Sequence, residues 1–339
     1  MQMVFCDTDA RLRKFFTSAR LPKGTKATFF AESVQDLSAE QLSKAKGAEV
    51  LSLFTYSRAP AEVLSRFPKL KLICQRSTGF NAIDLAYCKK RGIKVANVAG
   101  YGEVTVAEFS VGLLLDLVRK IGSSFYKIKH GIVDVAGDTG RDINGKTVGV
   151  IGTGAIGAHF ARLIHAFGTK VLAYDPFPNP KLEKDGVLKY TTLDEIYRKS
   201  DFISLHAPAT DKNYQMINEK AIAKMKKGVY IVNTARGQLI DTVALYNALK
   251  SGHVAGAGLD VLDHENIMIK NDISLLPRKK ADTIFYSLVN KMLVQLPNVV
   301  ITPHIAFNSE EAEQRILLGT VANLTDFVKT GEPKYSVSL

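Results

Sequence analysis

The feature that most constrains the fold is a glycine-rich turn that follows the short apolar run 148–151. Its glycines, at G-x-G-x-x-G spacing, are Gly152, Gly154 and Gly157. In such a turn the first glycine permits a tight bend, the second lets a pyrophosphate approach the backbone, and the third lets the following helix pack closely on the strand. Apolar residues at helical spacing and a second apolar run follow. We therefore predict a βαβ unit that binds a dinucleotide.

Asp175 ends the second apolar run and stands where dinucleotide-binding units carry the acidic residue that accepts from an adenosine ribose. The next residue is Pro176 rather than an arginine, and a carboxylate repels the 2′-phosphate of NADP. We therefore expect NAD as the cofactor. The alternative is an ordinary glycine turn in an α/β domain.

Composition limits the class of protein. The chain has 339 residues, enough for two domains, and its 46% hydrophobic and 23% charged content is typical of a globular protein. No apolar run approaches the roughly 20 residues of a membrane span, and the N-terminus lacks the order of a signal peptide. We expect a cytoplasmic protein with no membrane partner.

The net charge of +12 raises the alternative of nucleic-acid binding. The lysine clusters are short, lie at predicted element ends and lack interleaved aromatic residues, so solvated faces are the better interpretation. A positive field would also attract an anionic substrate. No histidine has metal-ligand spacing to a cysteine or to another histidine, so we expect no metal.

The order of apolar runs predicts an α/β fold of two doubly wound parallel-sheet domains. Residues 1–100 with 303–339 are expected to form a flavodoxin-like substrate domain, and residues 101–302 a Rossmann dinucleotide-binding domain inserted into it. The predicted strands of the first are 3–6, 27–31, 50–54, 70–74 and 95–98, and those of the second are 148–151, 171–174, 202–205, 229–232, 256–259 and 299–301.

Helix starts are predicted from capping residues. Capping boxes are expected at Ser38 with Gln41, Thr192 with Glu195, and Asn308 with Glu311, and further N-caps at Asn218 and Asp241. The segment 103–121 is apolar on nearly every side, so we predict one helix buried between subunits or domains. Its apolar surface predicts a homodimer.

Three short segments lie where strands of the second domain should end, the edge at which open α/β sheets bind ligands. They contribute Arg236, Glu265 and His304. Singly each has an ordinary interpretation, as a surface cation, a loop charge and a core or capping histidine. Together they supply a guanidinium for a carboxylate, a carboxylate to orient an imidazole, and an imidazole that titrates near neutral pH. Hydride transfer to a 2-keto acid requires that combination.

With these residues, the sequence resembles the D-isomer-specific 2-hydroxyacid dehydrogenases over almost its whole length. The matching segments occur in the family's order: 76–84 (RSTGFNAID), 101–103 (YGE), 105–108 (TVAE), the glycine-rich turn, 205–208 (LHAP), 233–237 (NTARG) and 302–304 (TPH). The long interval between Glu265 and His304, together with Tyr101 and Phe307, is most like the D-lactate dehydrogenase branch. Val104 and Phe109 depart from residues common in relatives.

The resemblance implies a role for each matching residue. Arg236 would bind the substrate carboxylate and polarise its carbonyl, His304 would donate the proton, and Glu265 would hold His304 in its charged form. Further substrate contacts would come from Thr78, Gly79, Tyr101 and Phe307. The cofactor contacts would be Gly152, Gly154, Ala155, Ile156, Gly157, Asp175, Ala207, Pro208, Asn213, Thr234, Ala235 and Asp260.

The resemblance therefore implies an NAD-dependent oxidoreductase that interconverts a small anionic 2-keto acid and its D-2-hydroxy acid. The alternative is a non-enzymatic, NAD(H)-sensing scaffold like the co-repressors that share the fold. Such proteins usually carry interaction tails, and none is recognised here.

Overall fold

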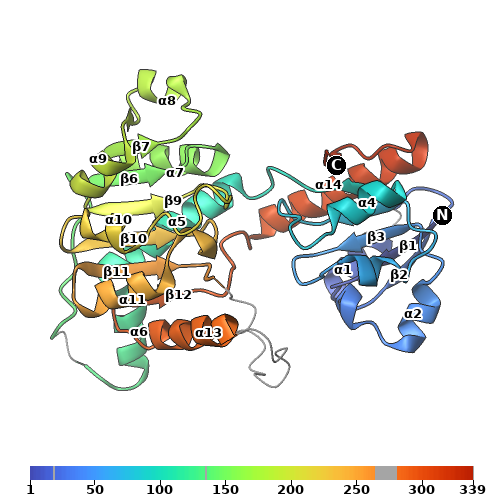
Figure 1. The fold of residues 1–339 in the computed structure, drawn as a ribbon, viewed down its shortest axis with the longest axis horizontal. Helices are drawn as coiled ribbons and strands as arrows, with labels where there is room; N and C mark the ends of the chain where they lie inside the picture. The colour runs from blue at the N-terminus through green and yellow to red at the C-terminus, as the bar shows by residue number, and fades with distance from the viewer. Residues whose placement is uncertain (18–19, 134–135, 264–280, 339) are drawn as a thin grey trace. The chain divides into compact units, whose positions relative to one another are not determined.

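The computed structural model describes residues 1–17, 20–133, 136–263 and 281–338, and in the last segment the side chains from residue 285 onward. The chain forms two compact units. The first unit is Met1–Tyr101 together with Ser309–Leu339, and the second is Gly102–Asn308. The expected fold class, two α/β units built on parallel sheets, is confirmed (Figure 1). The assignment of a substrate role to one unit stays a prediction.

The first unit is built on a five-stranded sheet in the order β2-β1-β3-β4-β5, with every pair parallel. This is the flavodoxin-like order, in which the chain turns back at the first strand. The strands are β1 (Gln2–Phe5), β2 (Lys26–Phe29), β3 (Val50–Leu53), β4 (Leu72–Gln75) and β5 (Lys94–Ala96).

Helices cover both faces of this sheet, because side chains on successive strand positions point to opposite sides. One face packs on α1 (Ala10–Thr17) and on α14 (Glu310–Thr330), the last helix of the chain. The other face packs on the turn at Val34 and on α2 (Ala39–Ala45), α3 (Ala61–Leu64) and α4 (Leu85–Arg91). The last segment of the chain therefore completes the core of the first unit.

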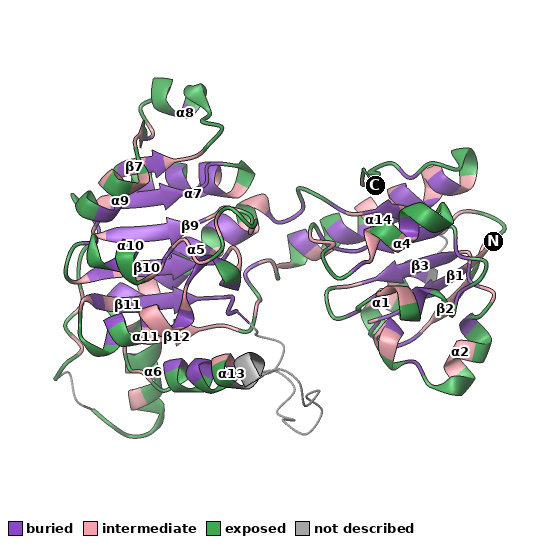
Figure 2. Cartoon of the chain, in the orientation of Figure 1, coloured by how far each residue is buried: buried purple, intermediate pink, exposed green. Residues whose placement is uncertain are grey.

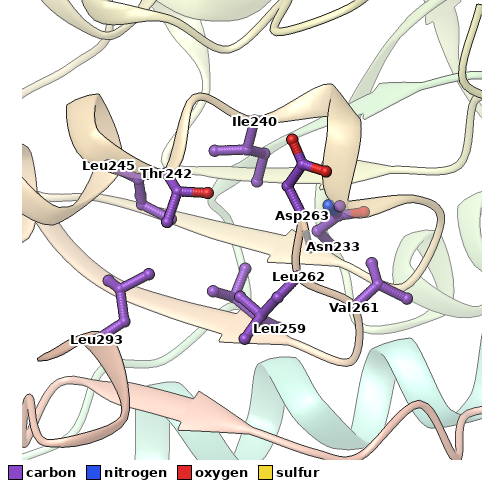
Figure 3. A pocket seen from close by; sticks show the side chains of 10 residues that line it. Asn233, Ile240, Thr242, Leu245, Leu259, Val261, Leu262, Asp263 and Leu293 are labelled. Carbon is purple, nitrogen blue, oxygen red and sulfur yellow. The ribbon is translucent and has the colours of Figure 1, made fainter. Parts of the chain in front are cut away.

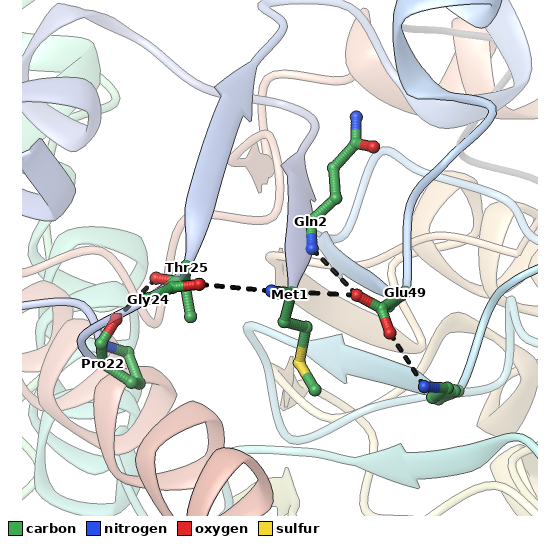
Figure 4. Close-up of polar contacts among 7 residues, drawn as sticks. Met1, Gln2, Pro22, Gly24, Thr25 and Glu49 are labelled. Atoms are coloured by element: carbon green, nitrogen blue, oxygen red, sulfur yellow. Dashed lines mark hydrogen bonds and ion pairs between the residues drawn. The ribbon is translucent and has the colours of Figure 1, made fainter.

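Polar contacts hold the first residues of β1 in place (Figure 4). The ammonium of Met1 donates to the carbonyl of Gly24 at 3.2 Å and lies 3.9 Å from the Glu49 carboxylate. Glu49 also accepts from the backbone N–H of Gln2 at 3.1 Å and pairs with Lys71 at 2.8 Å. These contacts tie β1 to the segments that enter β2, β3 and β4.

The second unit has a seven-stranded parallel sheet in the order β12-β11-β10-β9-β6-β7-β8. This is the Rossmann order with one additional strand at the β12 edge. The strands are β6 (Thr147–Ile151), β7 (Lys170–Tyr174), β8 (Lys189–Tyr190), β9 (Phe202–Leu205), β10 (Val229–Asn233), β11 (Val254–Leu259) and β12 (Val299–Ile301). The sequence predicted six of them and missed the two-residue edge strand β8.

Most strands of this sheet are buried between two layers of helices, whereas the edge strands β8 and β12 are only partly buried (Figure 2). Val148 and Val150 of β6 face α5 (Glu103–Arg119), α7 (Ala155–Ala166) and α8 (Pro180–Lys184). Ile151 of β6 faces the other layer. That layer comprises α9 (Leu193–Lys199), α10 (Glu219–Ala223), α11 (Thr242–Lys250) and α13 (Ala281–Val294). Among the described residues, no helix is both long and apolar enough to span a bilayer.

The prediction of one helix over 103–121 is wrong at its end. Lys120 has a left-handed backbone (φ 56°), which ends α5 at Arg119 and starts α6 (Ile121–Lys129) in a new direction. The apolar side of α5 packs on α7 and on the sheet of its own unit, through residues such as Val111 and Leu114. An apolar stripe is exposed on α6, none of whose residues is buried, and on α5 itself Val104 is exposed.

Most predicted caps are observed, and one is wrong. Ser38 with Gln41 forms the expected capping box, and Asn218 and Asp241 cap α10 and α11. The N-cap of α14 is Ser309 and not Asn308, because the Ser309 hydroxyl accepts from the N–H of Ala312 at 3.1 Å.

Only half of another predicted capping box forms. Thr192 accepts from the backbone of Glu195, whereas the Glu195 carboxylate bonds to Thr191 and Lys199.

Candidate functional site

The candidate site lies at the carboxyl edge of the seven-stranded sheet. All seven strands are parallel, so the segments that follow them meet along one edge. Most of the residues predicted from the sequence in this unit belong to those segments, from the turn after β6 to the turn after β12.

The glycine-rich turn joins β6 to α7, and its three glycines have different reasons to be glycine. Gly152 has φ 93°, and a Cβ there would lie 2.7 Å from the backbone of His206 and Ala207. A Cβ on Gly157 would lie 2.0 Å from the carbonyl oxygen of Gly152. Gly154, by contrast, has nothing within 4 Å of a built Cβ. The protein itself requires the outer glycines, whereas the middle one faces open space that a ligand can approach.

The start of α7 offers backbone donors beside that open space. Gly154 is the N-cap and has no side chain to satisfy the helix N–H groups. The N–H groups of the first turn, which includes Ala155 and Ile156, have no partner within their own helix, and the helix dipole adds positive charge there. This end of α7 therefore fits a pyrophosphate.

Asp175 follows β7 and is fixed by three donors. Its Oδ2 accepts from the backbone N–H of Thr153 at 2.6 Å and from the Thr153 hydroxyl at 3.1 Å, and its Oδ1 accepts from the N–H of Phe177 at 2.8 Å. Because Thr153 belongs to the glycine-rich turn, these bonds hold the carboxylate beside it. The half-buried Asp175 thus fits the ribose-binding role predicted for it.

The segment after β9 contains a half-buried histidine, His206, two residues before Pro208, a predicted cofactor contact. Burial lowers the pKa of His206 to about 3, so its ring is neutral at physiological pH. Its Nε2 lies 2.9 Å from the Ser204 hydroxyl, and its ring lies 4.7 Å from that of Phe160 in α7. His206 therefore packs behind the glycine-rich turn with a neutral ring.

The loop that follows is closed by Asn213, a predicted cofactor contact. The Asn213 amide donates to the carbonyl of Pro208 at 2.7 Å and accepts from the N–H of Thr210 at 2.7 Å. These bonds give Asn213 a loop-closing role, and its contact with the cofactor stays a prediction, as does that of Ala207.

The segment after β10 is held by Asn233. Its side chain donates to the carbonyl of Arg236 at 2.9 Å and accepts from the N–H of Ala235 at 3.0 Å, closing a tight turn. The Thr234 hydroxyl lies 2.7 Å from that of Ser110 on α5. Arg236 is half-buried, and its guanidinium donates to the carbonyl of Ala235 at 2.6 Å. The turn therefore fixes the backbone from which Arg236 projects.

His304 lies in a turn that a buried carboxylate organises. Asp260, after β11, accepts from the Thr302 hydroxyl at 2.6 Å and from the backbone N–H groups of Ile305 and Ala306, both at 2.9 Å. Its backbone carbonyl accepts from the N–H of His304 at 3.0 Å. Burial raises the pKa of Asp260, and its hydrogen bonds oppose that rise. This scaffolding role was not predicted, and the cofactor contact predicted for Asp260 stays a prediction.

The scaffold holds His304 in an uncommon backbone conformation, with φ 55°. Its ring meets that of Phe307 edge-on, with centroids 6.4 Å apart. Glu265, predicted to orient the imidazole, lies outside the described residues. The structure thus gathers Arg236, Asp260 and His304 at the ends of three neighbouring strands, β10, β11 and β12.

A small cavity lies behind this edge (Figure 3). It has a volume of about 10 Å³, room for at most one water molecule, and Asn233, Leu259 and Leu293 contribute to its largely apolar wall. Because it cannot hold a keto acid, it is not the substrate site. A Cβ on Gly237, which also lines it, would lie 2.1 Å from the backbone of Leu262, so the loops after β10 and β11 pack tightly.

The predicted substrate contacts Thr78, Gly79 and Tyr101 belong to the first unit. Carbonyl groups of the loop after β4 are already bonded, that of Gly79 to the Ser77 hydroxyl at 2.8 Å and that of Thr78 to the Asn97 amide at 2.8 Å. Tyr101 is buried, and its carbonyl accepts from Arg315 at 2.6 Å. Substrate binding by these residues stays a prediction.

Two further polar residues, one in the glycine-rich turn and one beside it, could not be identified from the sequence. The hydroxyl of Tyr190 on β8 lies 2.9 Å from that of Thr153, which in turn bonds to Asp175. Thr153 occupies an unconstrained position of the glycine motif, and Tyr190 lies in a strand too short for its pattern to be recognised. Among the described residues, no cluster of three or more potential metal ligands occurs.

Comparison with known proteins identifies the family. The model of the D-isomer specific 2-hydroxyacid dehydrogenase NAD binding domain matches residues 111–306. The chain is 40% identical over 293 residues to a 2-hydroxyacid dehydrogenase homolog of Zymomonas mobilis, covering 86% of each protein. It is also 40% identical over 293 residues to an aromatic 2-oxoacid reductase of Clostridium sporogenes, again covering 86% of each.

A solved structure agrees with these relatives. The crystal structure of D-lactate dehydrogenase from Aquifex aeolicus, complexed with NAD and lactic acid, matches with a TM-score of 0.85 and 37% identity, covering 99% of this chain and 100% of that one. The dinucleotide expected from the glycine-rich turn is thus NAD, and the chain belongs to the D-isomer specific 2-hydroxyacid dehydrogenase family.

Proposed function

We propose that this protein is an NAD-dependent dehydrogenase that interconverts a small 2-keto acid and its D-2-hydroxy acid. The observation that carries the proposal is the convergence of Arg236 and His304 on the edge of the sheet that also bears the glycine-rich turn and Asp175. A cation for a carboxylate and a titratable imidazole beside a nicotinamide dinucleotide are the groups that this chemistry needs.

Each residue has a proposed task in reduction. When bound, NADH supplies a hydride to the keto carbon. Arg236 binds the substrate carboxylate, since its guanidinium can engage both oxygens at once. His304 donates a proton to the carbonyl oxygen, and Glu265 keeps the imidazole oriented. Asp260 fixes the turn that carries His304, so its effect on the reaction is through position.

The substrate class is proposed from the family and from related proteins. One relative is named an aromatic 2-oxoacid reductase and another a D-lactate dehydrogenase, so the side chain of the keto acid is the variable feature. We propose a small side chain, as in pyruvate, because the sequence is most like the D-lactate dehydrogenase branch.

We further propose that the protein is a homodimer. Ile121, Phe125 and Ile128 of α6 lie three or four residues apart, on one side of the helix, and expose 57%, 63% and 61% of their surface. Monomers rarely expose such a continuous apolar stripe, and a second copy brings an identical stripe to cover it.

The function is tested by following NADH absorbance with pyruvate and with phenylpyruvate as alternative substrates. We expect oxidation of NADH with at least one keto acid and a higher kcat/KM for pyruvate. Preference for phenylpyruvate would contradict the proposed small substrate. Absence of turnover with any keto acid, together with tight NADH binding, would favour the non-enzymatic scaffold.

The role of His304 is tested by His304→Gln, which keeps a polar side chain but cannot donate the proton. Turnover should fall by about 10²–10⁴ while NADH affinity stays nearly unchanged. A matched control is His165→Gln, which changes an exposed histidine of the same unit and should leave turnover intact. Near-normal turnover in His304→Gln would overturn the assignment.

A further inference from the structure

We propose that Tyr190 is a positioning residue for the adenosine ribose of NAD and that it acts through Thr153 on Asp175. The inference rests on the proposed role of Asp175 as the ribose acceptor and deepens it. Tyr190 and Thr153 are both in the second unit, on β8 and in the glycine-rich turn.

The directions of the hydrogen bonds follow from the chemistry of the groups. A carboxylate only accepts, so the single hydroxyl hydrogen of Thr153 is donated to Asp175 Oδ2, at 3.1 Å. The 2.9 Å contact between the Thr153 and Tyr190 hydroxyls then requires Tyr190 to be the donor. The Tyr190 oxygen in turn accepts from the backbone N–H of Asn179 at 2.8 Å. Three hydrogen bonds therefore point in one direction, from Asn179 to Asp175.

A chain with a single direction strengthens each of its members, because each donor is polarised by the bond behind it. The last bond of this chain is the one from the Thr153 hydroxyl, and the Thr153 N–H makes a second bond to the same oxygen at 2.6 Å. Together they occupy both acceptor positions of Asp175 Oδ2. Among the described residues, Oδ1 has one donor, the N–H of Phe177. The remaining acceptor position is thus on Oδ1, where the fixed carboxylate can receive a ribose hydroxyl.

The fold explains why the residue at 190 can reach the turn. β8 pairs with β7 so that Tyr190 lies beside Ala173, two residues before Asp175. The Tyr190 hydroxyl oxygen accepts from the backbone N–H of Asn179, the N-cap of α8, and this bond fixes the phenol from its other side. β8 and β12 are the two edges of the sheet, so Tyr190 and His304 belong to opposite ends of the strand order.

The experiment measures equilibrium binding of NADH and of NADPH to the full chain by fluorescence titration. Tyr190→Phe removes the hydroxyl and keeps the ring, and it should weaken NADH binding about three- to tenfold, the effect of one hydrogen bond. Binding of NADPH should not change, because the 2′-phosphate cannot use the carboxylate. The preference for NADH over NADPH should therefore fall by the same factor, while the KM for the keto acid stays constant.

Two variants test the route through Thr153. Thr153→Val should reproduce the loss of preference, whereas Thr153→Ser keeps the hydroxyl and should retain the preference. Tyr230→Phe, in β10 of the same sheet, is the matched control and should bind both cofactors as the unaltered protein does. Unchanged preference in Tyr190→Phe, or an equal loss in Tyr230→Phe, would overturn the inference.

Asp175→Ala separates this inference from the assignment on which it rests. It should abolish most of the preference for NADH, and adding Tyr190→Phe to it should then cause no further loss. If Asp175→Ala leaves the preference unchanged, the ribose-binding role of Asp175 is wrong. If Asp175→Ala removes the preference but Tyr190→Phe still weakens NADH binding in its background, Asp175 is correctly assigned and the relay is wrong.

Discussion

At the scale of single residues, His206 is a titratable group whose pKa differs between the folded and the unfolded chain. The residue is half-buried behind the glycine-rich turn, and burial of its ring lowers its pKa to about 3 from an ordinary value of 6.5. In the unfolded chain the same imidazole takes up a proton near pH 6.5. Between about pH 3 and pH 6.5 the unfolded state binds more protons than the folded state. The free energy of unfolding therefore falls as pH falls through 6.5.

This difference predicts an acid-sensitive fold. Lowering the pH from 7.5 to 5.5 should cost about 1.4 kcal/mol of unfolding free energy through His206. Urea unfolding at the two pH values measures it. His206→Asn should lose this part of the pH dependence, whereas His165→Asn, at an exposed histidine, should keep it. If the free energy of unfolding falls equally between the two pH values in His206→Asn and in the unaltered protein, another group is responsible.

At the scale of elements, two glycines of the turn between β6 and α7 differ in what they affect. One is needed for the stability of the fold, and the other leaves room for the cofactor. A Cβ on Gly157 would lie 2.0 Å from the Gly152 carbonyl, so Gly157→Ala should destabilise the protein by at least about 2 kcal/mol. Gly154 has open space around it, so Gly154→Ala should change stability by no more than about 1 kcal/mol. The added methyl group would nevertheless stand where a pyrophosphate approaches.

Thermal unfolding and NADH titration distinguish the two variants. We expect Gly154→Ala to keep its melting temperature within about 4 °C and to bind NADH at least about tenfold more weakly. The expectation is wrong if Gly154→Ala binds NADH normally, or if Gly157→Ala is as stable as the unaltered protein.

The long apolar strands and the glycine-rich turn could be predicted from the sequence because one local pattern determines each. The buried strands β6 and β9 were located within one residue for this reason. β8 could not be predicted, since two residues carry no alternation and its pairing with β7 is a tertiary contact. The end of α5 at Lys120 was not predicted either, because the apolar spacing continues past it. Only the left-handed backbone of Lys120 ends the helix.

In the candidate site, too, residues marked by a local sequence pattern could be predicted, and those that depend on tertiary contacts could not. Arg236 and His304 were identified because each follows a recognisable strand, and the structure places them at one edge. The hydrogen bonds of Asp260 to Thr302, Ile305 and Ala306 join residues more than 40 positions apart in sequence. No local pattern encodes such contacts, so the scaffold of His304 became visible only in three dimensions.

At the scale of the whole molecule, the exposed stripe on α6 predicts how two copies associate. Phe125→Glu places a charge in the middle of the stripe and should shift the protein towards monomer, because an unpaired charge is costly in an apolar interface. Sedimentation velocity at micromolar concentration measures the shift. Tyr56→Glu changes an equally exposed aromatic residue of the first unit and serves as the control. A Phe125→Glu protein that stays dimeric would exclude α6 as the interface.

The discontinuous first unit has a consequence for the order of folding during synthesis. The second unit, Gly102–Asn308, is one continuous segment and can fold once its last strand has left the ribosome. The first unit cannot finish then, because α14 supplies Leu317, Leu324 and Phe327 to a core shared with Phe5 and Leu72.

The segment Met1–Tyr101 is therefore made before the second unit but completes its fold only after it. Until α14 emerges, the part of this sheet face that α1 does not cover remains open to water. We expect that interval to be the stage at which the nascent chain depends most on chaperones.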